Sequence, residues 1–521
     1  MDSQKIKAII IGALAAFAAL YLGITAATAQ FETIAWVISS AALITCLSLG
    51  PRIWLLIPFL GSMQLTLMLP GRPTSMIVAQ GLFVGFSILM ILIKKLPFRF
   101  KFTELEFWIF LLTIMVAQVY LRNPVGLSLF GGGMIGGRAY FLYGITLLTA
   151  LILCGLIVPP KDLKTALKLS VLGSLANFCI GLLGVFWLPA NYYFGKGSGA
   201  VANGPQQATI DTSIAGRVEF VRSMAQTLAT TVSAYKNSLL AAFSIKWAPL
   251  ILLSIIFAAA SGYRNVVAAI ALTYLVGLFY RGGFLSVVVS SILGAMVLGV
   301  VAVVNSVNPL PPNIQRSFSF LPGTWEERYE LDSASSSNWR LEIWKEVLFT
   351  DRWINNKIMG DGLGFSAKEL AIQENLSYKM KMMNITGTIG ISGFDLHREA
   401  ILSNGDYHSG PVSAIRTIGY LGLIIMSIAQ LRIVVHAHRQ IMRAKGTEWF
   451  PVTLFFCIPI IWAPLFFWLI YGGFSADGPA LLMSTAMLRM LQNNLPLPPY
   501  VPRSRNANVL QTQQTLQPTA S

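Results

Sequence analysis

Two arginines and one histidine, Arg264, Arg340 and His408, have the side-chain types needed to bind an anion and to move a proton. A guanidinium group matches two phosphate oxygens at once and stays charged at physiological pH. An imidazole titrates near neutral pH and can accept a proton from a sugar hydroxyl. Together these three side chains suit a reaction in which a diphosphate group leaves.

The surroundings of these residues support that chemistry. Arg264 stands in ASGYRNVV at the junction of two apolar runs, where an unpaired ionisable group is costly. Arg340 belongs to SNWRLEIWKEVL, whose apolar residues recur at helical spacing, and Ser337 or Asn338 is expected to cap that helix. His408 comes just before an apolar run, so we expect it at a membrane interface.

Further residues could complete an anion site. Arg217 and Arg222 lie in a polar stretch and would add positive charge near the first of these arginines. Gly360, Gly362 and Gly364, in MGDGLGFS, permit tight turns and a close approach of backbone N–H groups to a ligand. The same glycines also fit a purely structural turn after a helix.

Other interpretations stay open for the same residues. Arg340 also fits a solvated helix face, and Arg264 also fits a side chain that reaches lipid headgroups. His397, eleven residues before His408, competes with it as the titratable group. The four cysteines are far apart without CxxC spacing, and there are only four histidines, so we expect no metal and no cofactor.

Composition determines which elements must position these residues. Of 521 residues, 55% are hydrophobic and only 12% are charged, whereas a soluble domain carries roughly 25% charged residues. An ordinary soluble enzyme is therefore excluded. The net charge of +16 would suit nucleic acid only on a polar chain with exposed basic patches, so no nucleic-acid partner is expected and membrane lipids are. We predict an all-α, polytopic membrane helix bundle.

A bilayer core ~30 Å thick needs about 20 apolar residues per helix, and about 12–14 transmembrane helices are predicted on that criterion. The candidate spans are Ile9–Ala29, Ile34–Leu49, Ile53–Leu69, Met76–Ile93, Phe107–Leu121, Tyr140–Val158, Leu169–Leu188, Ser223–Phe243, Ala248–Ala260, Asn265–Tyr280, Phe284–Val304, Val412–Val434, Pro451–Tyr471 and Pro479–Leu491.

The short loops predict the orientation. Lys and Arg accumulate on the cytoplasmic side of a membrane, and their alternation here predicts that both termini lie inside. Residues 305–411, with 13 acidic and 10 basic side chains, then form a large helical periplasmic loop. This loop divides the first part of the bundle, 1–304, from the C-terminal spans, 412–491. Residues 492–521, rich in Pro, Gln and Thr, are expected to be a disordered cytoplasmic tail.

From Gly216 to Ile424 the sequence resembles the O-antigen ligase and polymerase superfamily of bacterial inner-membrane glycosyltransferases. Three motifs carry the resemblance, and they are Ser261-Gly262-Tyr263-Arg264, then Arg340-Leu341-x-x-Trp344 with Gly360-x-Gly362-x-Gly364, and last His408 with Gly419 and Gly422. Two positions depart from the family pattern: Ser409 stands where the family usually has Asn, and Thr417 where it usually has Glu.

The resemblance implies an all-helical enzyme that transfers a glycan from undecaprenyl diphosphate at the periplasmic face of the bacterial inner membrane. The acceptor would be lipid A core for a ligase, or another lipid-linked glycan for a polymerase. Arg264 and Arg340 would neutralise the departing diphosphate, and His408 would act as general base. The sequence leaves ligase and polymerase open. The alternative from another class is a flippase for lipid-linked oligosaccharides, although no internal repeat of the kind common in transporters is visible.

Overall fold

The computed structural model describes residues 40, 44–45, 48–67, 73–125, 137–186, 218–364, 375, 378, 402–403, 405 and 407–499. Its elements are η1 (Gly50–Leu55), α3 (Leu56–Met63), α4 (Ser75–Leu92), α5 (Glu104–Arg122), α6 (Arg138–Gly155), α7 (Pro160–Phe186), α10 (Phe220–Tyr235), α11 (Ser238–Ala241), α12 (Ala248–Ala260), α13 (Arg264–Val307), α14 (Pro312–Phe318), α15 (Glu327–Phe349), α18 (Gly410–Ala444), α19 (Phe450–Leu469) and α20 (Phe474–Asn494).

The predicted all-α, polytopic fold is confirmed. Seven of the described helices are long and apolar enough to cross a membrane, namely α4, α5, α6, α7, α13, α18 and α19. The described part of the chain contains isolated β-bridges but no strand. Helices are the expected solution because each satisfies its own backbone hydrogen bonds in a medium that offers no water.

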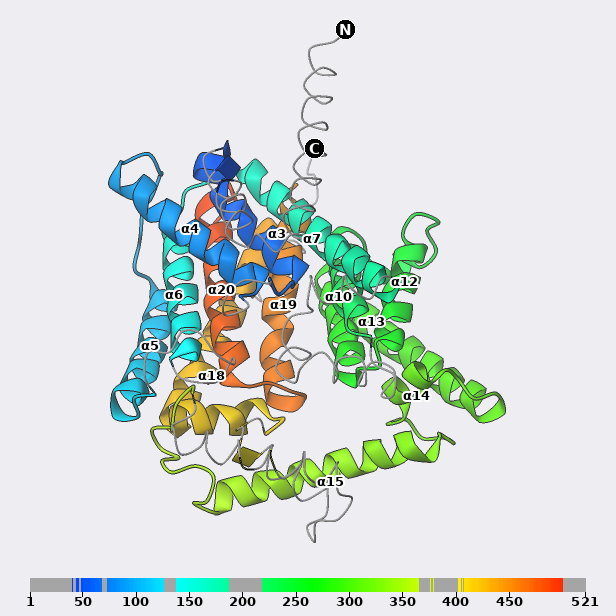
Figure 1. Ribbon diagram of the computed structural model, residues 1–521. Helices are drawn as coiled ribbons and strands as arrows, with labels where there is room; N and C mark the ends of the chain where they lie inside the picture. The colour runs from blue at the N-terminus through cyan, green and yellow to red at the C-terminus, as the bar shows by residue number, and fades with distance from the viewer. Residues whose placement is uncertain are drawn as a thin grey trace, which may run out of the picture.

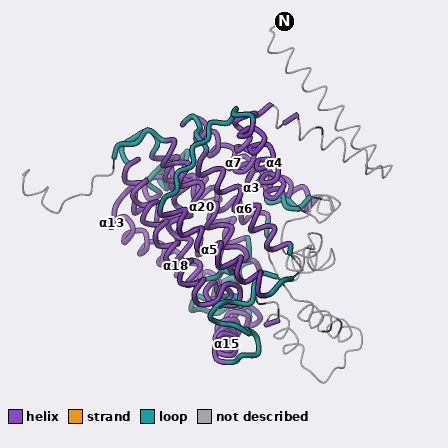
Figure 2. The backbone as a smooth tube through the Cα atoms, turned by 90° about the vertical axis from the view of Figure 1, so that its left-hand side faces the viewer, coloured by secondary structure: helices purple, strands orange, loops and turns teal. Residues whose placement is uncertain are grey.

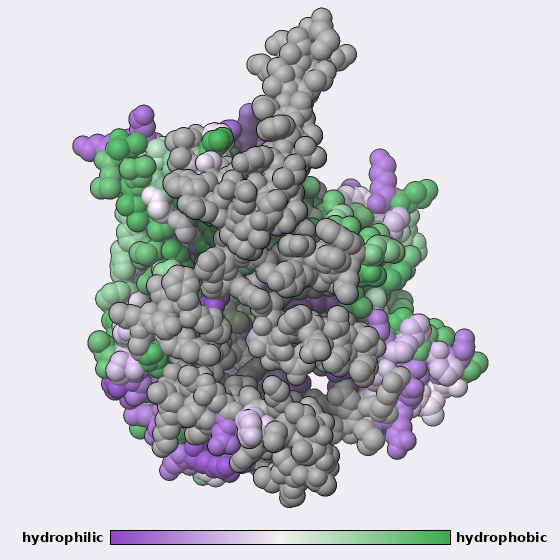
Figure 3. Space-filling model, viewed as in Figure 1, coloured by the Kyte–Doolittle hydropathy of each residue, from purple (hydrophilic) through white to green (hydrophobic). Residues whose placement is uncertain are grey.

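The main core forms around the second half of α18, which packs against α5, α19 and α20 (Figure 1). Met426, Ile433, Ala437 and Ile441 of α18 are at most 2% exposed. Their spacing of three to four residues and multiples of it places them along one stripe of the helix. Apolar side chains also cover the flanks of the molecule, while hydrophilic residues gather at its lower end (Figure 3). This distribution fits a bundle whose sides face lipid.

The predicted basic loops meet at one end of the bundle. Arg52 binds Asp162 at 3.1 Å, and Lys164 binds Glu448 at 2.7 Å. At the same end Arg443 donates to the carbonyl groups of 497 and 498. Helix α15, from the predicted outer segment, lies across the opposite end (Figures 1 and 2). The grouping of loops by charge is therefore reproduced in the fold.

Helix α13 turns back on itself at Gly283, whose φ is +77°. Its first residue, Arg264, donates to a backbone carbonyl of α14, and Ala302 near its other end packs in one apolar cluster with Phe318 of that same short helix. In a straight helix, Arg264 and Ala302 would be roughly 57 Å apart. The two halves therefore run back along each other. They correspond to two of the predicted spans, Asn265–Tyr280 and Phe284–Val304.

The predicted span Ile53–Leu69 is wrong in its length. Helix α3 ends at Met63, and Gln64 takes a left-handed φ of +49°. The chain then reverses, because the Ser75 N–H donates to the Leu65 carbonyl at 2.7 Å. The six residues of η1 and the eight of α3 together cover only about 24 Å, so this segment enters the bundle without crossing the ~30 Å of a bilayer core. The predicted span Ile9–Ala29 and most of Ile34–Leu49 lie outside the described residues.

The end of α20 also differs from the sequence prediction. The helix continues to Asn494, beyond the expected domain boundary at 492, and Leu495 is buried. The carboxamide of Asn494 explains the extension, because it accepts from the Val158 N–H at 2.8 Å and donates to the Leu156 carbonyl at 3.1 Å. These bonds tie the end of α20 to the loop between α6 and α7. Residues 500–521 lie outside the described residues.

A buried ion pair joins α5 to α20. Arg489 Nε donates to Glu106 Oε1 at 2.6 Å, and the two residues are 7% and 2% exposed. The other carboxylate oxygen of Glu106 accepts from the Thr103 N–H at 2.9 Å and so closes the capping box of α5. Both charges are therefore paired and hydrogen-bonded, which is the condition under which such charges persist in a low-dielectric interior.

We predict that Arg489→Gln destabilises the protein by about 3–5 kcal/mol, because it leaves the Glu106 carboxylate buried without a cation. The measurement is denaturant unfolding of the purified protein in detergent, followed by circular dichroism. The matched control is Arg432→Gln, which breaks a more exposed pair with Glu104 of the same helix α5. An equal loss of stability in both variants would contradict the prediction.

Candidate functional site

His408 lies in a sharply bent segment that leads into α18. Its φ of +51° is in the left-handed region, which non-glycine residues occupy rarely and mostly where the surrounding structure enforces it. Here Tyr407 is fully buried and donates its N–H to Ser413 Oγ at 3.3 Å, while the Ser409 hydroxyl caps α18. The imidazole packs beside Tyr471, with 5.7 Å between ring centroids. The imidazole is thus held just outside the start of a membrane helix, as predicted.

Helix α15 brings Arg340 to the same segment. One turn after Arg340, Trp344 donates its Nε1 to the Tyr407 carbonyl at 2.9 Å. Ile343, on the adjoining face of α15, is fully buried. Because residues i and i+4 share a helix face, Arg340 lies on the side of α15 that faces the His408 segment. The structure therefore brings these two predicted residues into one region.

The Nε of Arg340 is shielded from solvent and has no hydrogen-bond partner among the described residues. A buried, unpaired donor of a charged group costs more than one that is satisfied. An anionic ligand would remove that cost, because the guanidinium group donates in a fork that matches phosphate oxygens. This arrangement favours an anion-binding role over a solvated helix face.

The loop after α15 packs against a bend in α18 at Gly360. Gly419 bends that helix with a φ of +72°, and Gly360 has a φ of +84°. A Cβ on Gly360 would lie 2.6 Å from the Gly419 nitrogen, and one on Gly419 would lie 2.2 Å from the Ile358 carbonyl oxygen. A Cβ on Gly362 would lie 2.5 Å from the Tyr140 hydroxyl. Only glycine allows the two backbones to cross this closely.

The amides of this loop are used inside the protein. The Gly360 N–H donates to the Asn356 carbonyl at 2.7 Å, and the Gly362 N–H donates to the Thr417 carbonyl at 3.1 Å. Gly364 is buried as well. The geometry therefore gives these glycines a packing role, and their expected contact with substrate stays a prediction. The described residues of this loop form a structural turn after a helix, which is the other interpretation that the sequence allows.

Helix α5 fastens the same loop. Gln118 Nε2 donates to the Met359 carbonyl at 2.9 Å, and Arg122 donates to the Gly360 carbonyl at 2.8 Å. The sequence motifs do not single out these two residues. Their only sequence signal is a pair of polar side chains in the last turns of an apolar run, which is common at helix ends.

Arg416 is a buried cation that the motifs also miss. It lies eight residues after His408, in the first half of α18, and is 2% exposed. Gly405 makes room for it, since a Cβ there would lie 2.4 Å from Arg416 Cδ. The available signal was an arginine inside VSAIRTIGYLGLI, because charges within an apolar span are usually functional. Arg416 adds a positive charge to the end of the bundle that carries His408.

Arg264 begins α13, as predicted, but α14 holds its side chain. Its Nε donates to the Arg316 carbonyl at 3.2 Å, and its terminal nitrogen donates to Ser319 Oγ at 3.1 Å. The apolar side chains around α14 form a separate cluster from the main core that includes Ile343 and Tyr407. The two arginines are therefore positioned by different helices: α14 binds the side chain of Arg264, and α15 carries Arg340.

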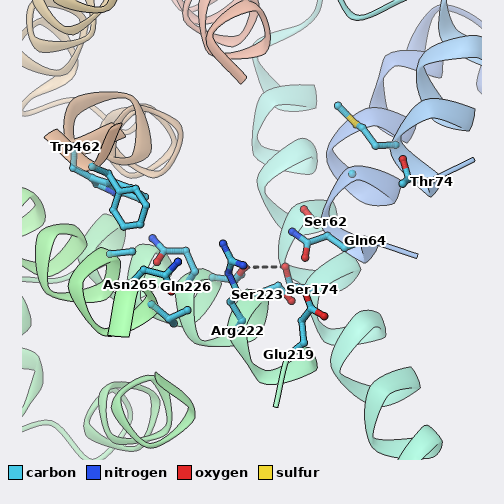
Figure 4. A pocket seen from close by; sticks show the side chains of 16 residues that line it. Ser62, Gln64, Thr74, Ser174, Glu219, Arg222, Ser223, Gln226, Asn265 and Trp462 are labelled. Atoms are coloured by element: carbon cyan, nitrogen blue, oxygen red, sulfur yellow. Dashed lines mark hydrogen bonds between the residues drawn. The ribbon is translucent and has the colours of Figure 1, made fainter. Parts of the chain in front are cut away.

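Arg222 lies on α10, with its guanidinium carbon 6.0 Å from the ring centre of Tyr263, the residue before Arg264. It is exposed and lines a cavity inside the bundle (Figure 4). The other predicted site residue of this stretch, Arg217, and the competing histidine, His397, lie outside the described residues. The described residues contain no group of three or more His, Cys, Asp or Glu side chains placed to hold a metal ion.

Comparison with known proteins adds no family to this picture. No protein-family model matches the chain, and a search of curated proteins finds no match.

We predict that Gly419→Ala and Gly360→Ala each destabilise the protein by about 2–4 kcal/mol, because a Cβ there adds a backbone clash to left-handed strain. Gly446→Ala is the matched control: its φ is +84° but nothing lies within 4 Å of the added Cβ. This control should lose only about 1 kcal/mol. Denaturant midpoints in detergent measure all three. If Gly446→Ala is as damaging as the others, strain alone explains the loss and the close crossing does not.

Proposed function

We propose that the protein is a membrane glycosyltransferase that moves a glycan from undecaprenyl diphosphate to an acceptor hydroxyl. The observation that carries the proposal is the unpaired, buried Nε of Arg340 on the helix face that Trp344 joins to the His408 segment. A guanidinium group with an unsatisfied donor, held in the same region as an imidazole, is the combination that such a transfer requires. The membrane bundle supplies the setting for a donor with a polyisoprenyl chain.

In the proposed reaction, His408 takes the proton of the acceptor hydroxyl as its oxygen attacks the anomeric carbon of the donor. The bond from that carbon to the diphosphate oxygen breaks, and both electrons leave with undecaprenyl diphosphate. Arg340 stabilises the charge that develops on the leaving group, and Arg416 adds to the positive field. Arg264 acts on the same diphosphate from the start of α13. The proposed reaction uses no metal and no cofactor.

The rigid surroundings support these roles. A catalytic group has to be held to within a fraction of an ångström of its working position. Trp344 fixes α15 to the residue before His408, and Ser413 fixes that residue from α18. The glycine crossing fixes the bend of α18 itself. These contacts hold the His408 segment between α15 and α18.

The proposed location is the inner membrane of a bacterium, with His408 and α15 on the periplasmic side. The acceptor is lipid A core if the enzyme is a ligase, and a second lipid-linked glycan if it is a polymerase. Deletion of the gene separates these reactions. A missing ligase leaves long free polymer on the lipid carrier, a missing polymerase leaves single repeat units there, and a missing flippase leaves no repeat units on the outer leaflet.

We predict that Arg340→Gln and His408→Asn each lower the rate of glycan transfer at least 100-fold, the usual order for losing a charge stabiliser or a general base. Asn is chosen because it tolerates the left-handed backbone of His408. The measurement is release of undecaprenyl diphosphate by the purified protein in lipid nanodiscs.

The matched control for Arg340→Gln is Lys345→Gln, which removes an exposed positive charge from the same helix. It should retain most of the transfer activity. Both active-site variants must also keep the unfolding midpoint of the unaltered protein within a few degrees. Full transfer activity in a folded His408→Asn variant would disprove the role of His408, and activity in Arg340→Gln would disprove that of Arg340.

A further inference from the structure

A second polar site lies inside the bundle, apart from the His408 segment. It is a cavity of about 590 Å³ between α3, α4 and α7 on one side and α10, α13 and α19 on the other (Figure 4). Its volume is within the ~300–1,000 Å³ typical of small-molecule sites. A cavity lined by polar side chains among membrane helices is costly to maintain, so its lining indicates what it accommodates.

Two polar atoms in the wall of this cavity are buried and have no hydrogen-bond partner among the residues that the structure describes. They are the acceptor Oδ1 of Asn265, on α13, and the donor Nε1 of Trp462, on α19. In Figure 4 these side chains extend from separate helices on the same side of the cavity. One unsatisfied acceptor and one unsatisfied donor call for a ligand that both donates and accepts. A hydroxyl group does both.

Some of the other polar side chains of the wall are already held by hydrogen bonds. Ser174 and Thr227 share a hydrogen bond of 2.8 Å between α7 and α10, and Gln226 donates to Thr273 at 2.7 Å. These bonds hold hydroxyl and amide groups in place before any ligand enters. A wall organised in this way offers directional contacts at little entropic cost.

The charges of the wall balance, and part of the wall is aromatic. Glu219, the residue before α10, and Arg222, in its first turn, contribute one charge of each sign. Phe466 lies beside Trp462, with 5.5 Å between the two ring centroids. A site without excess positive charge is a poor match for a diphosphate. Aromatic rings beside hydroxyl and amide groups match a sugar, which has apolar C–H faces and a rim of hydroxyl groups.

We infer that this cavity binds an uncharged sugar residue of a glycan, with a hydroxyl group held between Asn265 and Trp462. Asn265 follows Arg264 directly in the chain, so the cavity wall begins one residue after the arginine that opens α13. A glycan whose diphosphate end meets the outer arginines can therefore place a neutral sugar here. The assignment of this sugar to the transfer reaction rests on the proposed function. The binding of a neutral sugar does not.

The test uses the full chain in lipid nanodiscs, prepared without maltoside detergents because these are themselves sugars. Binding of maltose is measured by saturation-transfer NMR in a concentration series. We expect Asn265→Leu and Trp462→Phe each to weaken binding roughly three- to tenfold, the effect of losing one hydrogen bond. Trp468→Phe, at an exposed position of the same helix, is the matched control and should bind as the unaltered protein does.

Several results would overturn the inference. These are no binding of maltose by the unaltered protein, equal binding by the folded Trp462→Phe variant, and tighter binding of glucose 6-phosphate than of glucose. The proposed function fails separately. If maltose binding depends on Asn265 and Trp462 but the protein has no transfer activity, the sugar site is supported and the proposed enzymatic function is disproved. If the protein has transfer activity but no such maltose binding, the enzymatic function is supported and the sugar site is disproved.

Discussion

The contact between Gly360 and Gly419 is the constraint on which the outer end of the molecule depends. At this crossing the Asp361 and Gly362 amides donate to the carbonyl groups of Arg416 and Thr417. The bend divides α18 into a short outer part, which carries Arg416, and a long inner part, which forms the centre of the bundle. Any side chain at the crossing would push the α15 loop away from α18. The position of His408 relative to Arg340 therefore depends on this crossing as well as on the Trp344–Tyr407 hydrogen bond.

The membrane setting explains how polar groups are distributed. Where they have a structural role they are paired: Arg489 with Glu106, Gln440 with the Leu491 carbonyl, and Asn494 with the loop before α7. Arg340, Asn265 and Trp462 are among the described residues that keep a buried polar atom without a hydrogen-bond partner, and they are the ones that lie at the two candidate sites. Leaving such an atom unsatisfied costs about 1–3 kcal/mol, and a ligand that pairs with it would recover that free energy.

Much of the fold could be predicted because apolar length and periodicity act locally. The span Ala248–Ala260 coincides with α12, and the start of α13 at Arg264 follows from the charge at the junction of two apolar runs. The helix through Arg340 was also predicted, but its expected cap at Ser337 or Asn338 is wrong. Helix α15 begins at Glu327, because the preceding residues continue the helix although they lack an apolar stripe.

The rest depends on contacts between residues far apart in the chain, which one sequence does not encode in a readable form. Arg489 meets Glu106 across 383 positions, and Gln118 meets the glycine loop across 241. The three glycines illustrate the difficulty. Their spacing fits a ligand-binding loop and a close backbone crossing equally well, and only the position of Gly419 distinguishes the two. The cavity beside Asn265 gave no sequence signal, because its wall takes single residues from many helices.

In the proposed function, the two candidate sites bind different parts of a lipid-linked glycan: one binds the diphosphate and the other binds a neutral sugar. Arg340 and Arg416 lie toward the end of the bundle that α15 crosses (Figure 1), where, in the proposed function, a diphosphate headgroup would stay close to water and need not be fully desolvated. The cavity inside the bundle carries balanced charge and presents hydroxyl, amide and aromatic groups, which a neutral sugar satisfies without bringing an ion to membrane depth. An arrangement with the charges exchanged would bury an anion and expose a sugar, at a higher desolvation cost. The distribution of charge thus favours one orientation of the substrate.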